Sequence, residues 1–209
     1  MPVILVIDDH PAICFAVKAI LTPLAETIHT ATSGANALSA IKAQRPDLVI
    51  LDIMLNRMDG LQLLQHIRRQ AVNVQVVIYT SLPTEIYAPR AMRAGAAAFC
   101  NKDADIRQLA PLCQLVLQGY SCFPQGTLPT APVAATPVED PLAALSDREL
   151  TVLRYLVSGM SNKEIASRLL LSNKTISTYK RRLLDKLQQE NIESLRALLE
   201  PQPAGSDNG

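Results

Sequence analysis

Five side chains with acidic, hydroxyl or amino groups stand at or just beyond the ends of short apolar runs in the first half of the sequence. They are Asp8, Asp9, Asp52, Thr80 and Lys102. If the runs are neighbouring strands, the three carboxylates converge and repel one another unless a cation offsets their charge. A hard divalent ion with oxygen ligands fits such a group, and Mg²⁺ prefers one or two carboxylates with water and phosphoryl oxygens. The residues therefore predict a magnesium site.

The elements that must position these residues are alternating strands and helices. Continuous Val, Ile and Leu runs indicate strands buried on both faces, as in parallel sheets, and the segments between them have helical spacing. Five such repeats with right-handed crossovers predict an α/β domain with a doubly wound, five-stranded parallel sheet, which binds ligands beyond the carboxyl ends of its strands. The predicted strands are Val3–Ile7, Thr27–Ala31, Leu48–Leu51, Val74–Tyr79 and Ala97–Cys100, and the predicted helices are Ala12–Leu24, Gly34–Gln44, Gly60–Arg69, Thr84–Ala94 and Ile106–Gln118.

The composition changes sharply in a proline-rich stretch, residues 124–141. Proline fixes its own backbone angle and disfavours helix in the residue before it, so this stretch predicts an extended tether. We therefore divide the chain into a first domain over 1–123, a linker over 124–141, a second domain over 142–200 and a disordered tail over 201–209.

The second domain has helical signals and no strand signal. Capping boxes begin at Ser146 and Ser161, a third helix begins at Ser172 and extends to about Leu187, and a fourth follows Asn191. Short helices around a turn at Leu171–Ser172 predict an all-α helix-turn-helix domain. A local cluster of basic residues lies in this half, with Lys174, Lys180, Arg181 and Arg182 in the third helix.

Composition excludes several classes of protein. The 209 residues are 48% hydrophobic and carry a net charge of +1, which favours packed cores and excludes bulk attraction to polyanions. Apolar runs are too short for a membrane helix, and the N-terminus lacks the pattern of a signal peptide. The four cysteines have neither Cys-x-x-Cys nor zinc-ligand spacing, which favours reduced thiols in a cytoplasmic protein without membrane insertion.

With these residues in place, the first domain resembles the receiver domain of bacterial two-component response regulators. The resemblance implies that Asp52 accepts a phosphoryl group and that Asp8, Asp9, Asp52 and the backbone carbonyl of Met54 hold Mg²⁺. It also implies that Thr80 and Lys102 bind the phosphoryl oxygens. Thr80 would then shift towards the phosphoryl group, and Phe99, in the place of the family's switching aromatic, would repack and favour a homodimer.

The second domain resembles the LuxR-type helix-turn-helix of NarL/FixJ-class regulators, and the whole chain resembles most the BvgA/EvgA-like subgroup. The matching segments are Arg148–Leu153, Gly159–Ala166 and Leu171–Lys180, with Gly119-Tyr120 and Phe123-Pro124 ahead of the linker. Two-fold pairing in this family implies inverted half-sites about one helical turn apart on double-stranded DNA.

A helical wheel separates two faces of the third helix. Ile176, Leu183 and Leu187 share an apolar stripe that packs on the other helices, and the polar residues point away. A helix in the major groove reads nucleobases from such an exposed face, while flanking Lys and Arg side chains hold phosphates. By resemblance we assign base-edge contacts to Ser177, Thr178 and Arg181, and phosphate contacts to Lys174, Lys180 and Arg182.

Three functions are consistent with these features. The favoured one is a DNA-binding transcription regulator, not an enzyme, that a sensor histidine kinase or phosphotransfer protein phosphorylates on Asp52. The second is a regulator that acts without phosphorylation, with the first domain as a docking module. The third is a magnesium-dependent phosphatase with Asp52 as nucleophile, which the second domain and the apolar Met54 disfavour.

Overall fold

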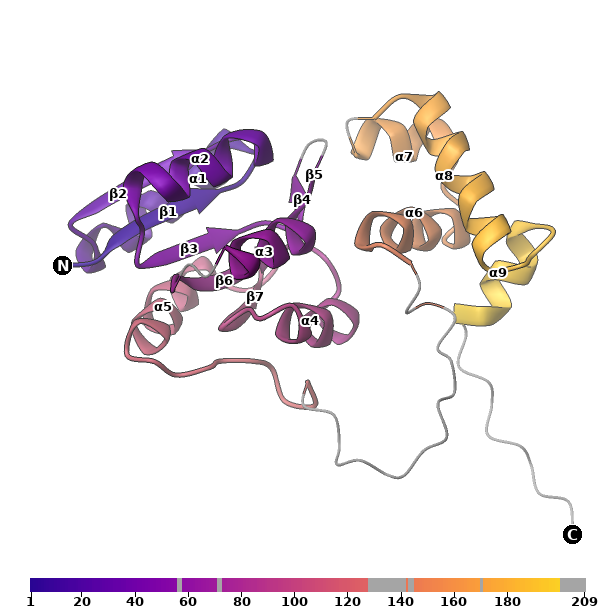
Figure 1. Cartoon of the computed structure of the whole chain (residues 1–209). Helices are drawn as coiled ribbons and strands as arrows, with labels where there is room; N and C mark the ends of the chain where they lie inside the picture. Colours follow the sequence, from indigo (N-terminus) through magenta and orange to yellow (C-terminus); the bar gives the residue numbers. More distant parts are fainter. Residues whose placement is uncertain (56–57, 71–72, 128–141, 143–144, 170, 200–209) are drawn as a thin grey trace, which may run out of the picture. The chain divides into compact units, whose positions relative to one another are not determined.

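The computed structural model describes residues 1–55, 58–70, 73–127, 142, 145–169 and 171–199 (Figure 1). The chain divides into two compact units, residues 1–135 and 136–209. Among the described residues, no helix has the length and apolar character needed to cross a membrane.

The first unit is built on a five-stranded sheet in the order β2-β1-β3-β6-β7, with every neighbouring pair parallel. All four residues of β3 are buried, as the continuous apolar run predicts. The predicted α/β doubly wound fold is therefore confirmed. The strands are β1 (Val3–Ile7), β2 (Thr27–Ala31), β3 (Leu48–Leu51), β6 (Gln75–Thr80) and β7 (Ala98–Asn101).

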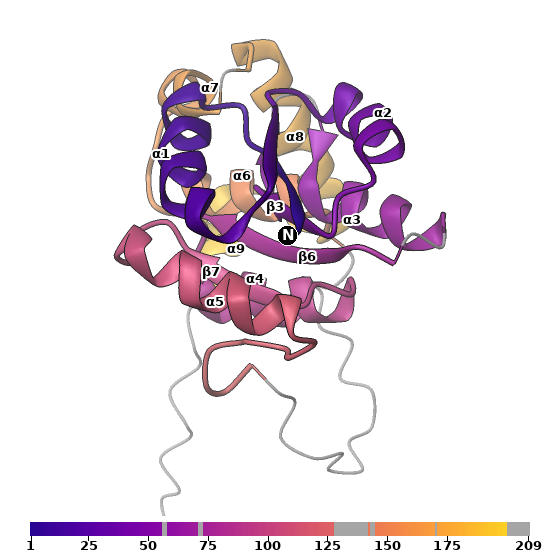
Figure 2. The ribbon, with the colours of Figure 1, turned by 90° about the vertical axis from the view of Figure 1, so that its left-hand side faces the viewer.

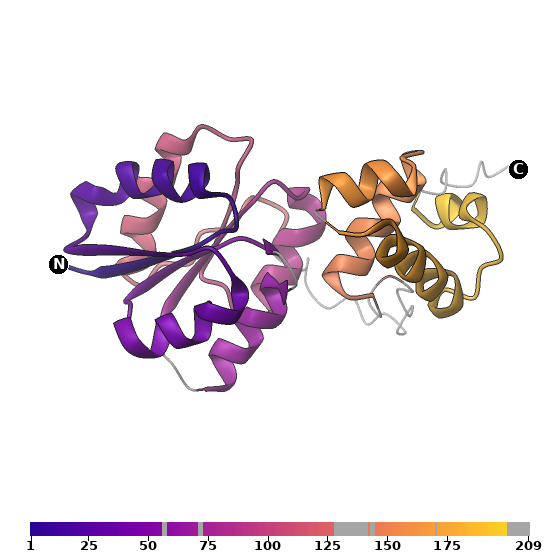
Figure 3. The same cartoon turned by 90° about the horizontal axis from the view of Figure 1, so that it is seen from above.

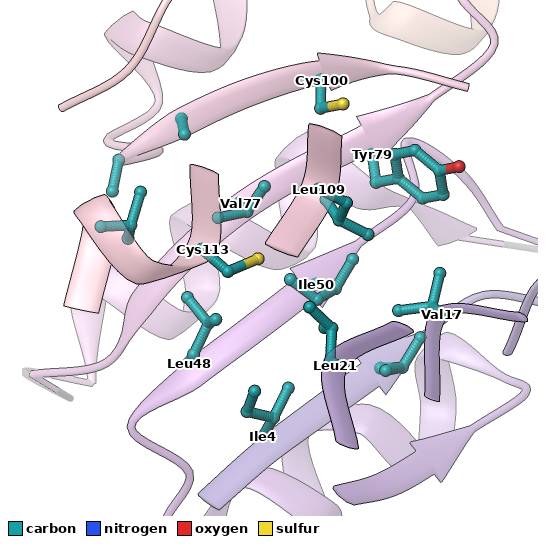
Figure 4. Packing of buried hydrophobic residues seen from close by; sticks show 14 of the residues in the cluster. Ile4, Val17, Leu21, Leu48, Ile50, Val77, Tyr79, Cys100, Leu109 and Cys113 are labelled. Carbon is teal, nitrogen blue, oxygen red and sulfur yellow. The ribbon is translucent and has the colours of Figure 1, made fainter. Parts of the chain in front are cut away.

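Helices cover both faces of this sheet. In Figure 2, α1 lies on one side of the strands and α2 and α3 on the other, and Figure 3 shows α1 and α5 together on one side. The core between the sheet and α1 and α5 contains Ile4, Leu48 and Cys113 (Figure 4). The helices are α1 (Pro11–Leu21), α2 (Gly34–Gln44), α3 (Gly60–Arg69), α4 (Thr84–Arg93) and α5 (Leu109–Leu117), with short 3₁₀ turns at Thr22–Leu24 and Ile106–Gln108.

A short antiparallel hairpin after β3 was not predicted from the sequence. It consists of β4 (Met54–Leu55) and β5 (Met58–Asp59), and it leads directly into α3. A Cβ on Gly60 would lie 2.1 Å from the backbone oxygen of Asp52, so only glycine fits where the chain passes this close. The Asp59 carboxylate caps α3 by accepting from the backbone N–H groups of Leu61 and Gln62.

The chain after α5 returns to the free edge of β7. The backbone N–H of Cys122 donates to the carbonyl of Ala97 at 2.9 Å, and the N–H of Phe99 donates to the carbonyl of Cys122 at 3.1 Å. Thr127 is buried and its hydroxyl donates to the carbonyl of Pro124. The described structure of the first unit therefore reaches into the sequence expected to be linker, whereas residues 128–141 and the expected tail lie outside the described residues.

The second unit contains four helices, α6 (Asp147–Val157), α7 (Asn162–Arg168), α8 (Asn173–Lys186) and α9 (Ile192–Leu199), in its described residues. Both predicted capping boxes, at Ser146 and Ser161, are present. Ser172 caps α8, and the Asn191 side chain accepts from the backbone N–H of Ser194 at the start of α9. Leu150, Leu153, Ile165, Ile176, Leu183 and Leu195 form its buried apolar residues together with Leu145, Val152, Leu156, Ala166 and Leu187.

Candidate functional site

The register of the parallel strands brings the predicted residues of the first unit to one edge. Ile7 pairs with Leu51, so Asp8 and Asp52 both lie one residue beyond a paired position. On the other side of β6, Thr80 pairs with Asn101, and the backbone N–H of Lys102 donates to the carbonyl of Thr80 at 2.8 Å. The site is thus set by backbone pairing between segments that are distant in sequence.

Lys102 bridges two of the three carboxylates. Its Nζ donates to Oδ2 of Asp8 at 2.6 Å and to Oδ2 of Asp52 at 2.7 Å. The Lys102 side chain is only 9% exposed and the two carboxylates are 3% exposed. Burial lowers the pKa of Lys102, but the ion pairs with Asp52 and Asp8 outweigh it, so the pKa is raised and the amine stays charged.

Asp9 belongs to the same cluster of acidic groups as Asp8 and Asp52, and it contacts His10. Its Oδ1 is buried and has no hydrogen-bond partner, although His10 Nδ1 lies 2.9 Å away. His10 Nδ1 also lies 3.1 Å from Oδ1 of Asp8. Burial raises the pKa of Asp9, Asp52 and Asp8 raise it further, and His10 opposes the shift. His10 was not predicted as a site residue, and the only signal for it in the sequence is its position next to Asp9.

These groups fit a hard divalent cation. One ligand atom from each of Asp8, Asp9, His10 and Asp52 lies within 4.8 Å of the others, and the buried Asp9 Oδ1 makes no hydrogen bond. The carboxylate oxygens are the ligand type that Mg²⁺ prefers. Met54, whose carbonyl the resemblance adds to the ligands, lies beside them, because its backbone N–H donates to Oδ1 of Asp52 at 3.2 Å.

Thr80 and Phe99 both lie buried close to this edge. The Thr80 hydroxyl accepts from the backbone N–H of Leu82 at 3.4 Å. Phe99 is 3% exposed. Its neighbours in β7, Ala98 and Cys100, belong to the core beneath α1 and α5, so Phe99 points to the opposite face of the sheet.

In the second unit, α8 carries the predicted DNA-binding residues on its polar face. Ile176 and Leu183 are fully buried, as the wheel predicts. Of the six predicted DNA contacts, Lys174, Ser177, Arg181 and Arg182 are exposed and Thr178 and Lys180 are partly exposed. Lys174, Thr178 and Arg182 share a shallow hollow of about 350 Å³ with Ser172, Thr175 and Tyr179.

Two of the predicted base-reading side chains already have partners within the unit. The Ser177 hydroxyl donates to the carbonyl of Asn173 at 3.1 Å and accepts from the amide of Asn162 on α7 at 3.2 Å. The Thr178 hydroxyl donates to the carbonyl of Lys174 at 3.0 Å. Both hydroxyls are held in fixed positions, and both keep acceptor capacity.

An ion pair that was not predicted from the sequence joins α6 to α8 in the second unit. Lys186 Nζ donates to Oε2 of Glu149 at 2.7 Å, and the same carboxylate closes the capping box at Ser146. The capping pattern predicts the local bonds of Glu149 but not a partner from another helix.

Comparison with known proteins identifies both units. Residues 4–114 match the response regulator receiver domain, and residues 143–198 match the luxR family of bacterial regulatory proteins. The virulence-factor transcription regulator BvgA of Bordetella pertussis is 36% identical over 195 residues, which cover 92% of this chain and 93% of that protein.

Two further relatives extend the match. The DNA-binding transcriptional activator EvgA of Escherichia coli strain K12 is 30% identical over 192 residues, covering 91% of this chain and 94% of that protein. The structure of a complex of the response regulator RcsB with DNA has a TM-score of 0.56 at 21% identity, covering 95% of this chain and 97% of that one, which supports the fold. The chain therefore belongs to the NarL/FixJ family of two-component response regulators, which regulate transcription through a LuxR-type DNA-binding domain.

Proposed function

We propose that this regulator is switched by phosphorylation of Asp52 and that the phosphorylated form dimerises and binds an operator. A sensor histidine kinase or phosphotransfer protein supplies the phosphoryl group in the cytoplasm. The proposal assigns residues 1–123 to the receiver, 124–141 to the tether and 142–200 to DNA binding. The observation that carries it is the buried Lys102 amine between the carboxylates of Asp8 and Asp52.

The chemistry follows from the groups at this edge. A carboxylate oxygen of Asp52 attacks the phosphorus of a phosphohistidine, the P–N bond breaks, and the imidazole leaves with the bonding electrons. Mg²⁺, when held by Asp8, Asp9, Asp52 and the Met54 carbonyl, offsets charge on the carboxylates and on the transferring group. Lys102 contributes a positive charge next to Asp52 and binds a phosphoryl oxygen.

The switch depends on two buried side chains. The Thr80 hydroxyl leaves its weak 3.4 Å contact with the Leu82 backbone and binds the phosphoryl group. Phe99 repacks into the space that this movement opens, which changes the surface formed by α4, β7 and α5. Dimerisation through that surface pairs two copies of the DNA-binding domain.

On DNA, α8 lies in the major groove. Ser177, Thr178 and Arg181 contact base edges, and Arg181 donates two hydrogen bonds to guanine. Lys174, Lys180 and Arg182 contact phosphates, which position the helix and supply affinity that does not depend on sequence. Lys174 and Arg182 line the same hollow on α8, which places two positive charges on one face of the helix and supports their role as phosphate contacts.

The test compares the full chain with Asp52→Asn, each with and without acetyl phosphate and Mg²⁺. DNA fragments selected from a random duplex pool by the wild-type protein serve as the probe. We expect a dimer and tighter binding only for treated wild type, measured by light scattering and fluorescence anisotropy. Equal binding in all four samples would favour the docking-module function, and sustained hydrolysis of a small phosphate ester would favour the phosphatase.

A further inference from the structure

The ring of Tyr79 lies beneath the amine of Lys102. Tyr79 is the residue before Thr80 in β6, is 3% exposed, and belongs to the core under α1 and α5. Figure 4 shows it at the opposite end of this core from Leu48. Lys102 Nζ lies over the ring at 5.7 Å from its centroid, within the range in which a cation is attracted to an aromatic face.

The other contacts of the amine are made by groups that the proposed reaction uses. Lys102 Nζ donates to Oδ2 of Asp8 and to Oδ2 of Asp52. Asp8 is a proposed metal ligand, and Asp52 is both a metal ligand and the proposed nucleophile. Once these oxygens bind the metal or phosphorus, their hydrogen bonds to Lys102 weaken or are lost. A neutral aromatic ring neither ligates Mg²⁺ nor reacts, so its contact with the amine can persist throughout.

Burial around the ring strengthens the attraction. Both side chains are less than one-tenth exposed, and a cation–π contact is stronger when water is excluded. Burial also raises the pKa of the Tyr79 phenol, Cys100 and Asp8 raise it further, and Lys102 opposes the shift. The phenol is therefore neutral at pH 7, and the interaction is with the face of the ring.

We propose that Tyr79 is a positioning residue for phosphoryl transfer, whose ring holds the Lys102 amine in the site while Asp8 and Asp52 change partners. The inference rests on the proposed phosphorylation of Asp52. It assigns to Tyr79, a residue of the core under α1 and α5, a contact with the amine of Lys102 in addition to its packing role.

The experiment uses the full chain and two substitutions, Tyr79→Phe, which keeps the aromatic face, and Tyr79→Leu, which removes it. With acetyl phosphate and Mg²⁺ we expect the leucine variant to be phosphorylated about five- to tenfold more slowly at saturating donor, and the phenylalanine variant to stay within about twofold of wild type. Mg²⁺ affinity, measured by calorimetry, should change little, because Tyr79 supplies none of the proposed oxygen ligands.

Two controls separate positioning from packing. Val77→Ala removes a buried side chain from the same face of β6 and should leave the rate per folded molecule unchanged. In a Lys102→Met background, Tyr79→Leu should have no further effect on the rate, since the ring would act through the amine. The proposal is wrong if the leucine variant reacts like wild type, if phenylalanine is as slow as leucine, or if the effect persists without Lys102.

A spectroscopic measurement tests the contact without any reaction. An aromatic face shifts the NMR signals of the Lys102 ε-methylene protons upfield, with and without Mg²⁺, in wild type and Tyr79→Phe, and the shift should disappear in Tyr79→Leu. If wild type accepts no phosphoryl group, the proposed function fails and the kinetic role fails with it. If wild type is phosphorylated but the ring shift is absent, only the role of Tyr79 is overturned.

Discussion

The carboxylate site of the receiver and the polar face of α8 use charge in opposite ways. The side chains of Lys102, Asp8 and Asp52 are buried, and Lys102 forms ion pairs with both carboxylates at the ends of three strands. Arg181 and Arg182 are exposed on successive positions of a single helix. Buried charges have a large energetic effect and a fixed geometry, because losing one partner leaves the other desolvated. Exposed charges contribute little individually to stability and become important when a polyanion approaches.

Removing the Lys102 amine gives the strongest test of this contrast. Lys102→Met leaves two buried carboxylates facing each other, so we expect the first unit to lose about 3–5 kcal/mol of unfolding free energy without divalent cation. Mg²⁺ should restore part of the loss, because it binds the folded site. Urea unfolding with and without Mg²⁺ measures both. Lys18→Met, at an exposed position of α1, is the control, and an equal small loss in both variants would contradict the interpretation.

Arginine substitutions on α8 should affect DNA binding and leave folding almost unchanged. Arg181→Gln should cost about 1–3 kcal/mol of binding and relax the preference at one base pair, because a bidentate guanine contact is lost. Arg182→Gln should weaken binding to all sequences and reduce the salt slope by about one, as expected for a phosphate contact. Anisotropy titrations at several salt concentrations separate the two.

A matched control for these variants is Arg107→Gln in the first unit. Arg107 is exposed and pairs with Asp105 through three side-chain hydrogen bonds, far in sequence from the helix-turn-helix. Its loss should leave the salt slope unchanged. If Arg181→Gln and Arg182→Gln change the slope equally without changing base preference, both residues contact phosphates and the assignment of Arg181 is wrong.

The sequence predicts which segments form the five strands of the sheet better than it predicts where each strand ends. Strands β1, β2 and β3 agree with their predicted bounds, whereas β6 and β7 begin and end one residue later than predicted. Apolar runs in the sequence indicate which segments are buried. The first and last residue of a strand, however, depend on its hydrogen bonds with the neighbouring strand. The two-residue strands β4 and β5 are too short to show any periodicity.

Contacts between distant segments limit prediction at the sites. The spacing of Asp8, Asp52 and Lys102 predicts that they converge, because parallel strands align their carboxyl ends. It does not predict that Lys102 contacts Tyr79 or that Cys122 pairs with the edge of β7, since both depend on side-chain direction and on the path of the chain after α5. The capping box at Ser146 is predictable because all of its partners lie within four residues.

The ion pair between Glu149 and Lys186 joins a buried carboxylate to an exposed amine. Its loss should have the smallest effect of the changes considered. Burial raises the pKa of Glu149, but hydrogen bonds from Lys186 and Ser146 outweigh it and lower the pKa overall. A lowered pKa in the folded state means that the stabilisation is complete above the ordinary value near 4.5 and is lost as the pH falls through the folded value. We therefore expect Lys186→Met to cost the second unit about 1 kcal/mol at pH 7 and less at pH 3.

Carbon-detected NMR of the Glu149 carboxyl group measures this directly. Its titration midpoint should lie below the ordinary value in wild type and rise in Lys186→Met, while the control Lys163→Met, an exposed lysine of α7, should leave it unchanged. Since the Ser146 bonds remain in the variant, the midpoint should rise only part of the way. An unchanged midpoint would assign the lowered pKa to the capping box alone, and Glu149 would then behave as a local helix cap without a stabilising link to α8.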